Sequence, residues 1–219
     1  PVFKKKDRMS VENYRPISVL PTISKVFERL MQKQIISFLD KYLSPFMCGY
    51  RKGFNSQHAL VLLMERWKKQ LDDKGYCGAI LMDLSKAFDT INHDLLIAKL
   101  SAYGFSVDAL RILCSYLSDR WQRVKINTSF SSWRELKQGV PQGSVLGPIL
   151  FYIFLNDLFM FFPTDNLISY ADDDTPIYIG KDSAEVLTGL EEVSKILLDW
   201  FQNNSMKANA DKYHFLISD

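Results

Sequence analysis

The amino-acid sequence predicts an α+β fold in which helices and short strands share a hydrophobic core. Its 219 residues are 47% hydrophobic, which is enough apolar material for a sizeable folded unit. The stretches 23–38 and 60–71 repeat apolar residues at helical spacing, whereas the run 79–82 is short and continuously apolar, as in a buried strand. Because helices and strands follow one another without a strict βαβ order, α+β is favoured over a parallel sheet.

The first two predicted helices rest on apolar residues three and four positions apart, which line one face of a helix. We expect these faces to be core: Ile23, Val26, Phe27, Leu30, Met31, Ile35 and Phe38 in the first, and Leu60, Leu63, Met64, Trp67 and Leu71 in the second. Gly75 and Gly78 then bracket a change of period, and the apolar run ends at Asp83. A buried strand is therefore predicted to deliver a carboxylate at its tip.

Further helices are predicted at 94–103 and 107–117, separated by Gly104, a frequent helix stop. A loop rich in glycine and proline, 139–143, leads into an apolar helix that begins at Ser144. That helix is expected to be buried, because its apolar run is too short to span a bilayer.

A hairpin is predicted between these helices and the loop. Val124 and Ile126 alternate with polar neighbours, and Trp133 and Leu136 are expected on a partner strand across the turn 127–132. Alternation of this kind is typical of a half-buried strand.

The C-terminal part of the sequence predicts a second hairpin, a helix and a last strand. The apolar runs 167–171 and 175–179 flank three consecutive aspartates, which indicates a hairpin with acids at its turn. The helix is expected at 183–203 and the strand at 213–217.

Net charge and cysteine content limit the classes of protein only weakly. The net charge is +2 with a pI near 8.5, so nucleic-acid binding has to be argued from local clusters, of which any one is also compatible with a solvated face. The three cysteines have no zinc-binding spacing, and their odd number argues against a disulfide framework, which indicates a reducing compartment. The basic clusters are Lys4, Lys5, Lys6 and Arg8; Arg51 and Lys52; Arg66, Lys68 and Lys69; and Arg120, Arg123 and Lys125.

The predicted strands bring acidic residues to one edge of a sheet. Paired in one sheet, the strand ending at Asp83 and the hairpin carrying Asp172 and Asp173 would converge three carboxylates. Mg²⁺ prefers such hard oxygen ligands, and two ions can clamp an in-line phosphoryl displacement. Aspartate is also a favoured turn residue, so spacing alone leaves a metal site and a solvated turn both open.

Six blocks of the sequence occur in the order typical of reverse transcriptases. Tyr170-Ala171-Asp172-Asp173 resembles their YxDD box, and the stretch LMDLSKAFD, residues 81–89, resembles their first palm motif. The remaining blocks are NYRPIS at 13–18 and GYRKGF at 49–54, similar to the fingers motifs, the PQG block at 138–148, and the next palm motif at 200–201 with 203–212. The leading residues 1–6 and the stretch SKAFDTINHDLL are similar to the enzymes of non-LTR (LINE-type) retrotransposons.

This resemblance implies a right-hand polymerase reduced to fingers and palm, with an antiparallel palm sheet, packed helices and no thumb. Residues 1–75 would form the fingers and 76–219 the palm, with 95–137 inserted between the palm motifs. No initiator methionine or signal sequence opens the chain, so it is interpreted as a piece of a longer protein. The parent protein would carry the thumb and an endonuclease domain, would have no membrane partner, and would be intracellular, in the nucleus or in a cytoplasmic ribonucleoprotein.

The resemblance also implies RNA-directed DNA synthesis, with an RNA template, a DNA primer and dNTP as partners. Two Mg²⁺ ions, or Mn²⁺ in their place, would be held by Asp83, Asp172 and Asp173, which would be the catalytic carboxylates. Asp174 follows the box at a variable position and is interpreted as a turn residue. Asp89 is expected to be a helix N-cap or turn ligand.

Two basic residues of the fingers block are candidates for triphosphate binding. Arg51 offers a bidentate fork and Lys52 a point charge, and the motif that they resemble closes over the nucleotide. The alternative is a surface pair beside Gly53.

Four other residues are assigned to substrate binding by the resemblance. Gln142 and Gly143 would contact the incoming nucleotide and the template, and Phe88 would lie against the sugar and select dNTP over rNTP, unless it is an ordinary core residue. Lys212 would donate a proton to the leaving pyrophosphate, or else be a solvated lysine.

Three other functions remain as alternatives. A metal-dependent nuclease would also use clustered acids, although it does not account for the fingers blocks. A group II intron-type reverse transcriptase shares the YxDD box. A decayed retroelement remnant would fold and bind RNA without catalysis.

Overall fold

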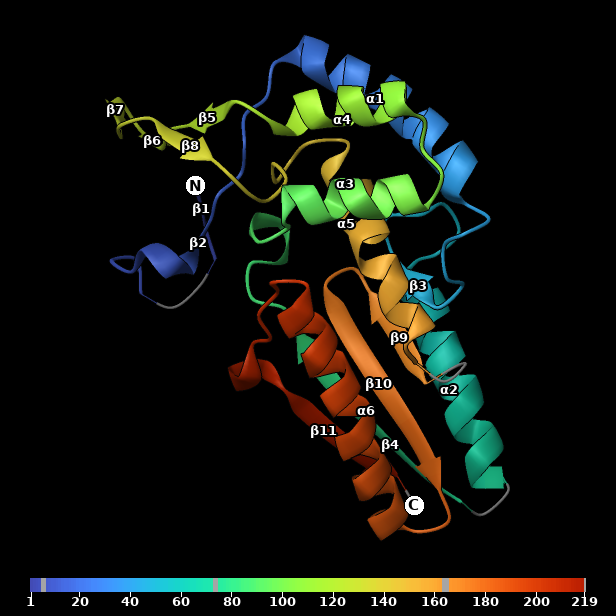
Figure 1. The fold of residues 1–219 in the computed structure, drawn as a ribbon. Coiled ribbons are helices and arrows are strands. Elements are labelled where there is room, and N and C mark those ends of the chain that lie inside the picture. Colours follow the sequence, from blue (N-terminus) through green and yellow to red (C-terminus); the bar gives the residue numbers. More distant parts are fainter. Residues whose placement is uncertain (5–6, 73–74, 163–165, 219) are drawn as a thin grey trace. The chain divides into compact units, whose positions relative to one another are not determined.

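The computed structural model describes residues 1–4, 7–72, 75–162 and 166–218, and the predicted α+β class is confirmed (Figure 1). The chain divides into two compact units, the first comprising Pro1–Leu39 and Phe88–Phe151 and the second Asp40–Ala87 and Tyr152–Asp219. The assignment of fingers to 1–75 and palm to 76–219 stays a prediction. Lys5, Lys6 and the side chain of Leu71, which the sequence analysis singled out, lie outside the described residues.

The second unit is built on a five-stranded sheet in the order β11-β4-β10-β9-β3 (Figure 1). Neighbouring strands are antiparallel except β3 and β9, which are parallel. The strands are β3 (Met47–Cys48), β4 (Tyr76–Asp83), β9 (Leu167–Tyr170), β10 (Asp173–Gly180) and β11 (His214–Ser218). The predicted strand ending at Asp83 and the predicted hairpin of aspartates are thus neighbours.

Helices cover both faces of this sheet. On one face, α2 (Ser56–Asp72) packs Leu62, Leu63 and Trp67 against a core that includes Cys77 and Ala79. On the other face lies α6 (Ser183–Asn203), so close that a Cβ on Gly78 would come within 2.6 Å of Val186 and Leu190. Glycine at this position therefore permits the close approach of helix and strand.

The first unit is mainly helical and carries its strands in short pairs. The pairs are β1 with β2, β5 with β8, and β6 with β7. Its elements are β1 (Val2–Phe3), η1 (Val11–Asn13), β2 (Tyr14–Arg15), α1 (Thr22–Leu39), α3 (His93–Ala102), α4 (Val107–Leu117), β5 (Arg120–Gln122), β6 (Lys125–Ile126), β7 (Ser129–Phe130) and β8 (Arg134–Leu136). Helix α5 (Gly147–Asn156) begins in the first unit and ends in the second, and η2 (Ala87–Asp89) lies where the chain changes unit. The short helices η3 (Asp157–Met160) and η4 (Ala210–Lys212) belong to the second unit.

Local capping explains where several helices begin. The side chains of Asn92, Ser106 and Asp182 accept hydrogen bonds from backbone N–H groups three residues further on, at the starts of α3, α4 and α6. Such caps satisfy donors that have no partner within the helix. Gly104, with φ of 89°, separates α3 from α4, as the sequence predicted.

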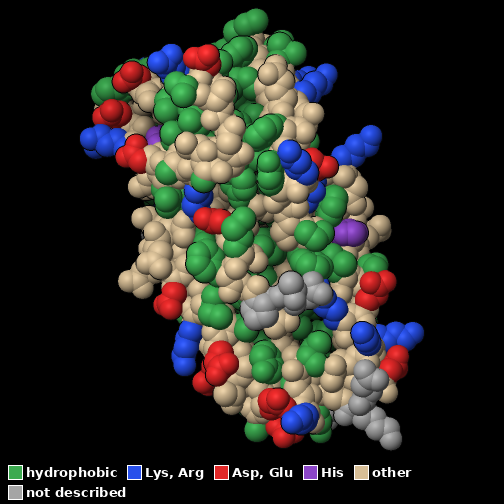
Figure 2. All heavy atoms as spheres, turned by 45° about the vertical axis from the view of Figure 1, so that its right-hand side comes forward, with side chains coloured by type: hydrophobic (Ala, Val, Ile, Leu, Met, Phe, Trp, Pro, Cys, Tyr) green, Lys and Arg blue, Asp and Glu red, His purple; other side chains and the backbone are tan. Residues whose placement is uncertain are grey.

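The prediction of a core face on α1 is wrong for most of its residues. Ile23, Val26, Phe27, Leu30 and Phe38 are exposed, and Ile35 is the one residue of the predicted set that is buried. Leu60 and Met64 of α2 are exposed as well, and Figure 2 shows hydrophobic side chains at the surface between scattered charges. Periodicity identifies an amphipathic helix, but it does not identify what covers the apolar face.

The central hairpin was predicted correctly in type but not in its pairing. Lys125–Ile126 pairs with Ser129–Phe130 across a tight turn, and Leu136 lies on the outer strand opposite Arg120. Trp133 lies between β7 and β8 rather than on a strand. No helix among the described residues is long and apolar enough to cross a membrane, and the three cysteines are free thiols.

Candidate active site

The three aspartates of the predicted catalytic set lie on neighbouring strands of the second unit. Strand β4 ends at Asp83 and β10 begins at Asp173, and the two residues stand directly opposite each other in the antiparallel ladder. Directly opposed side chains project from the same face of a sheet. Asp172 precedes Asp173 in the turn between β9 and β10, so the structure brings the three acids to one corner of the sheet.

The turn that carries Asp172 has only two residues between its strands. Tyr170 and Asp173 are paired, and Ala171 adopts a positive φ of 59°, which L-residues rarely do. The N–H of Ala171 donates to the carbonyl oxygen of Cys48 at 3.0 Å, and the hydroxyl of the buried Tyr152 donates to the same oxygen. A carbonyl of β3 therefore fixes a strained turn in place.

Negative charge accumulates at this corner. Partial burial raises the pKa of the Asp173 carboxyl, and the charges of Asp172 and Asp83 raise it further, while the positive charge of Lys212 opposes the shift. Like charges that are held close together destabilise the ionised state, and a bound cation relieves this.

Residues after α6 bind Asp83 directly. Lys212 donates from Nζ to Oδ2 of Asp83 at 2.5 Å, and the amide of Asn209 donates to the same oxygen at 3.0 Å. The backbone N–H of Asn209 also donates to the carbonyl of Asp83 at 2.8 Å. Asn209 was not among the predicted site residues, although it lies inside the palm block at 203–212.

The residues present fit a hard divalent cation. In the described part of the chain, no three His, Cys, Asp or Glu side chains are already arranged as a metal-binding cluster. However, carboxylate oxygens are the ligands that Mg²⁺ prefers, and the raised pKa of Asp173 reflects in part negative charge that a cation would neutralise. Asp83, Asp172 and Asp173 are therefore the residues that could hold such an ion.

Asp174 is not the turn residue that the sequence predicted. It is fully buried within β10, where Ser169 of β9 donates to its Oδ1, and its Oδ2 has no hydrogen-bond partner among the described residues. Burial raises the pKa of Asp174 to about 7. The strand alternates faces, so Asp174 points away from the face of Asp173. A sequence of three consecutive acids gives no signal of this inversion.

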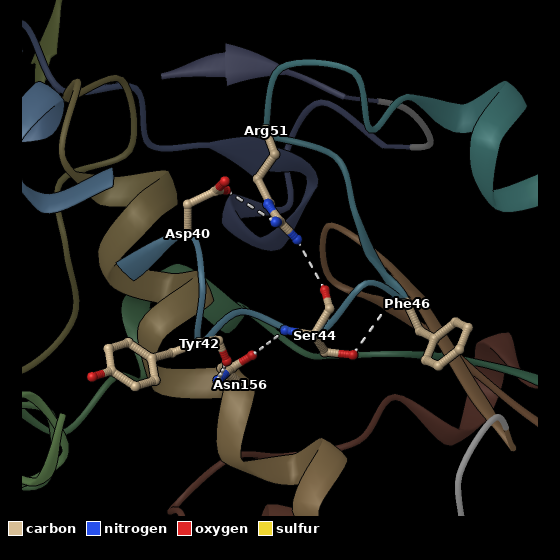
Figure 3. A network of polar contacts seen from close by, with 6 residues as sticks. All are labelled: Asp40, Tyr42, Ser44, Phe46, Arg51 and Asn156. Carbon is tan, nitrogen blue, oxygen red and sulfur yellow. Dashed lines mark hydrogen bonds and ion pairs between the residues drawn. The ribbon is translucent and has the colours of Figure 1, made fainter. Parts of the chain in front are cut away.

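Arg51 is held in a network of polar contacts within the second unit (Figure 3). Its guanidinium donates from Nη1 to the carbonyl of Ser44 at 2.9 Å and from Nη2 to Asp40 at 3.1 Å, and it stacks over the ring of Phe54 at 4.1 Å. The Arg51 side chain is only 8% exposed, against 67% for Asp40. A triphosphate would therefore have to compete with Asp40 for this guanidinium, whereas Lys52 is exposed.

Asn156 of α5 supports the same network. Its Oδ1 accepts from the N–H of Ser44 at 2.8 Å, and its Nδ2 donates to the carbonyl of Tyr42 at 3.0 Å (Figure 3). The loop that holds Arg51 is thus fixed to a buried helix residue that the sequence analysis did not identify.

The remaining candidates of the sequence analysis lie in the first unit. Gln142 donates from Nε2 to Asp89 at 2.9 Å and accepts at its carbonyl from the N–H of Ser18 at 2.8 Å. Gly143 has φ of 99°, and a Cβ there would come within 3.3 Å of the Ser18 carbonyl. Phe88 stacks on Phe151, with ring centroids 4.9 Å apart and an interplanar angle of 29°.

Comparison with known proteins identifies the family of the chain. The family model described as "Reverse transcriptase (RNA-dependent DNA polymerase)" matches residues 3–218. The chain belongs to the reverse transcriptase family. This confirms the resemblance drawn from the six sequence blocks.

Two relatives of this reverse transcriptase domain come from mobile elements. It is 35% identical over 220 residues to a probable RNA-directed DNA polymerase from transposon BS of Drosophila melanogaster. This match covers 94% of this chain and 24% of the relative. It is 30% identical over 211 residues to the RNA-directed DNA polymerase from mobile element jockey of the same species, with 92% and 23% covered. The chain therefore spans about a quarter of the length of these relatives.

A solved structure of apo telomerase from Candida tropicalis, truncated from the C-terminal domain, shares the fold of the reverse transcriptase domain. Its TM-score is 0.62 at 17% identity, and the match covers 90% of this chain and 41% of the telomerase chain. At this identity the likeness shows the fold alone.

Glu28 is a further residue that the sequence analysis of this reverse transcriptase domain missed. Its buried carboxylate accepts from the backbone N–H groups of Val145 at 2.6 Å and Leu146 at 3.1 Å, just before α5 begins. A carboxylate that accepts from backbone N–H groups at a helix start is favoured by the helix dipole. Glu28 therefore anchors the PQG loop that contains Gln142 and Gly143.

Proposed function

We propose that the chain is the catalytic part of an RNA-directed DNA polymerase, which joins dNTP to the 3′-hydroxyl of a DNA primer on an RNA template. The observation that carries the proposal is the register of Asp83 against Asp173, with Asp172 in the adjoining turn. Family membership supports the reaction class. The assignment extends to the longer parent protein only as a proposal, since the chain spans about a quarter of its relatives.

The protein's contribution to the reaction is positioning and electrostatics. Asp83, Asp172 and Asp173 would hold two Mg²⁺ ions, or Mn²⁺ in their place, and the bound ions would stabilise the negative charge that develops on the transferring phosphoryl group. Lys212 keeps Asp83 paired at 2.5 Å, which balances charge before metal binds, and the same ammonium would donate a proton to the leaving pyrophosphate.

Five further residues would bind the substrate. Arg51 would contact the triphosphate by exchanging its contact with Asp40, with Lys52 beside it, whereas Gln142 and Gly143 would contact the nucleotide and template from a loop anchored by Glu28. Phe88 would lie against C2′ of the incoming sugar and exclude a 2′-hydroxyl, which cannot find a partner against an apolar ring. The protein would work in a reducing compartment, the nucleus or a cytoplasmic ribonucleoprotein, as part of a longer chain with a thumb and an endonuclease.

Primer extension on an RNA template tests the proposal. Asp172→Asn and Asp173→Asn keep the shape of the side chain but remove its charge, so the extension rate should fall by orders of magnitude in either variant. Asp199→Asn, at an exposed position of α6, is the matched control and should extend normally.

The alternatives give different outcomes in the same assay. Degradation of the template without extension would indicate a nuclease, and RNA binding without either reaction by the wild type would indicate a decayed remnant. Near-normal extension by Asp173→Asn would remove that residue from the catalytic set.

A further inference from the structure

The stretch 119–137 of the first unit forms an arm whose surface is almost entirely open to solvent. Every residue from Trp121 to Glu135 is exposed, including Trp121 at 59%, Phe130 at 51% and Trp133 at 55%. The arm contains the strand pairs β5–β8 and β6–β7 and projects beyond α4 (Figure 1). A two-stranded ribbon that packs on no core is only marginally stable by itself, and large exposed aromatic residues usually mark a binding surface.

Two basic side chains of this arm contact its aromatic rings. The Arg123 guanidinium lies 4.1 Å from the ring centroid of Phe130 and 4.6 Å from that of Trp133. The Lys125 ammonium lies 5.5 Å from the Phe130 ring. A guanidinium stacked on rings keeps its N–H edges available to an anion, so the contacts order the group without neutralising it.

Positive charge is concentrated in the arm. Residues 119–137 contain five basic and two acidic side chains, an excess larger than the net charge of +2 of the whole chain. Lys137 pairs with Glu135 at 3.8 Å, whereas Arg123, Lys125 and Arg134 form no ion pair with any residue that the structure describes. Two of these cations, Arg123 and Lys125, lie against the exposed rings of Phe130 and Trp133.

The root of the arm is fixed. Arg120 donates from Nη1 to the carbonyl of Tyr116 at 3.1 Å and stacks over its ring at 5.2 Å. Ser118 closes α4 by donating to the Cys114 carbonyl, and Asp119, with φ of 50°, turns the chain into β5. The start of the arm is therefore held against the end of α4.

We propose that this arm, which contains none of the candidate catalytic residues, is a binding surface for single-stranded nucleic acid. Unpaired bases stack on Trp133, Phe130 and Trp121, and their phosphates pair with Arg123, Lys125 and Arg134. Stacking platforms combined with basic side chains are the usual means of binding a single strand without sequence preference. The inference rests on the proposed function in one respect, that the ligand is a nucleic-acid strand.

The test is the affinity of the whole chain for unstructured 12-nucleotide RNA and DNA strands, measured by fluorescence anisotropy. Trp133→Ala and Arg123→Gln should each weaken binding about tenfold, which corresponds to about 1.4 kcal/mol. Arg123→Gln should also make the dependence of log K on log salt shallower by roughly 0.7, because one phosphate contact is lost. Trp133→Phe keeps a stacking ring and should bind nearly as well as the wild type.

Matched controls come from exposed residues of the same unit outside the arm. Phe27→Ala on α1 and Arg111→Gln on α4 remove an exposed ring and an exposed guanidinium and should leave the affinity unchanged. Tryptophan fluorescence gives a second readout, because strand binding should quench the emission of the wild type and quench it less in Trp121→Phe/Trp133→Phe.

The outcomes separate this inference from the proposed function. Asp173→Asn should bind strands normally while failing to extend a primer. Loss of extension with normal strand binding is therefore compatible with binding by the arm. Unchanged affinity in both Trp133→Ala and Arg123→Gln would overturn the inference. So would equal competition by polyglutamate, which offers charge without bases, or tighter binding of a blunt duplex than of either single strand. The relative affinities for the RNA strand and the DNA strand distinguish a template strand from a product strand as the ligand.

Discussion

The two regions that carry the candidate site residues differ in how their polar groups are satisfied. At the β9–β10 turn, Asp172 and Asp173 lie beside Asp83, and partial burial together with the charges of Asp172 and Asp83 raises the pKa of Asp173. In the PQG loop, Gln142 and the N–H groups of Val145 and Leu146 all have partners within the protein. The turn therefore retains repulsion between carboxylates that a bound cation can relieve. The loop is instead a scaffold whose polar groups are satisfied within the protein and which positions its residues.

Removal of Glu28 should weaken the scaffold side of this comparison strongly. Glu28→Ala leaves two buried N–H groups without an acceptor, and each such loss costs about 1–3 kcal/mol. We expect the free energy of unfolding, measured by urea titration, to fall by about 3 kcal/mol. Glu28→Gln keeps a carbonyl acceptor and should lose about 1 kcal/mol. Equal stability of Glu28→Ala and the wild type would show that the loop does not depend on this carboxylate.

Phe88 tests whether a scaffold residue also selects the substrate. Its ring stacks on Phe151, which is fully buried. Phe88→Ala should lower stability by about 2 kcal/mol through the lost stacking and burial, and should raise the ratio of rNTP to dNTP incorporation.

Phe151→Ala is the matched control for this prediction. It removes the buried partner of the same ring pair and should cost about 3–5 kcal/mol without changing the rNTP to dNTP ratio. A ratio that stays constant in Phe88→Ala, with both activities depressed together, would make Phe88 an ordinary core residue.

Asp174 tests what a buried carboxyl next to the candidate catalytic aspartates contributes to stability. Its pKa of about 7 in the folded protein lies above the usual value of 3.8, so the folded state binds this proton more tightly than the unfolded state. This contribution to stability is complete below about pH 4 and is lost as the pH rises through about 7, at up to about 1.36 kcal/mol per pH unit. Unfolding measured between pH 4 and 8 should show this decline in the wild type and a flatter profile in Asp174→Asn.

The same variant bears on function. Asp174 faces away from Asp173, so Asp174→Asn should still extend a primer. Loss of extension with an unchanged fold would show that Asp174, rather than its neighbours, belongs to the catalytic set.

The smallest expected effect concerns strain in the turn. Ala171 has φ of 59°, where an L-residue is disfavoured by roughly 1–2 kcal/mol and glycine is not. Ala171→Gly should therefore stabilise the protein slightly, by about 0.5 kcal/mol, because the greater freedom of glycine in the unfolded chain offsets part of the gain. A shift of the melting temperature upward by a degree or more would agree, and a clear decrease would show that the turn is not strained.

The sequence predicts the elements well because their signals are local. The strand ending at Asp83, the hairpin of aspartates and the helices on either side of Gly104 follow from periodicity and turn residues. The exposure of Val26 and Leu30 could not be predicted, because a helical stripe does not specify what covers it.

The candidate site shows the same limit. Asp83, Asp172 and Asp173 are visible in the sequence, but the opposite orientation of Asp174 depends on where β10 begins, within one residue. Glu28 and Asn209 were missed because their partners, Val145 and Asp83, lie more than a hundred residues away in the chain. Single polar residues inside a helix or a loop carry no signal of such distant contacts.

The position of the bound metal tests the central claim most directly. Fe²⁺ that replaces Mg²⁺ in the presence of ascorbate and peroxide cleaves the backbone next to the ion, and the fragments can be mapped by mass spectrometry. We expect cleavage at Asp83 and at Asp172–Asp173 in the wild type, suppressed by excess Mg²⁺, absent in Asp173→Asn and retained in Asp199→Asn. Cleavage at other positions, or an unchanged pattern in Asp173→Asn, would contradict the assignment of the metal to these three carboxylates.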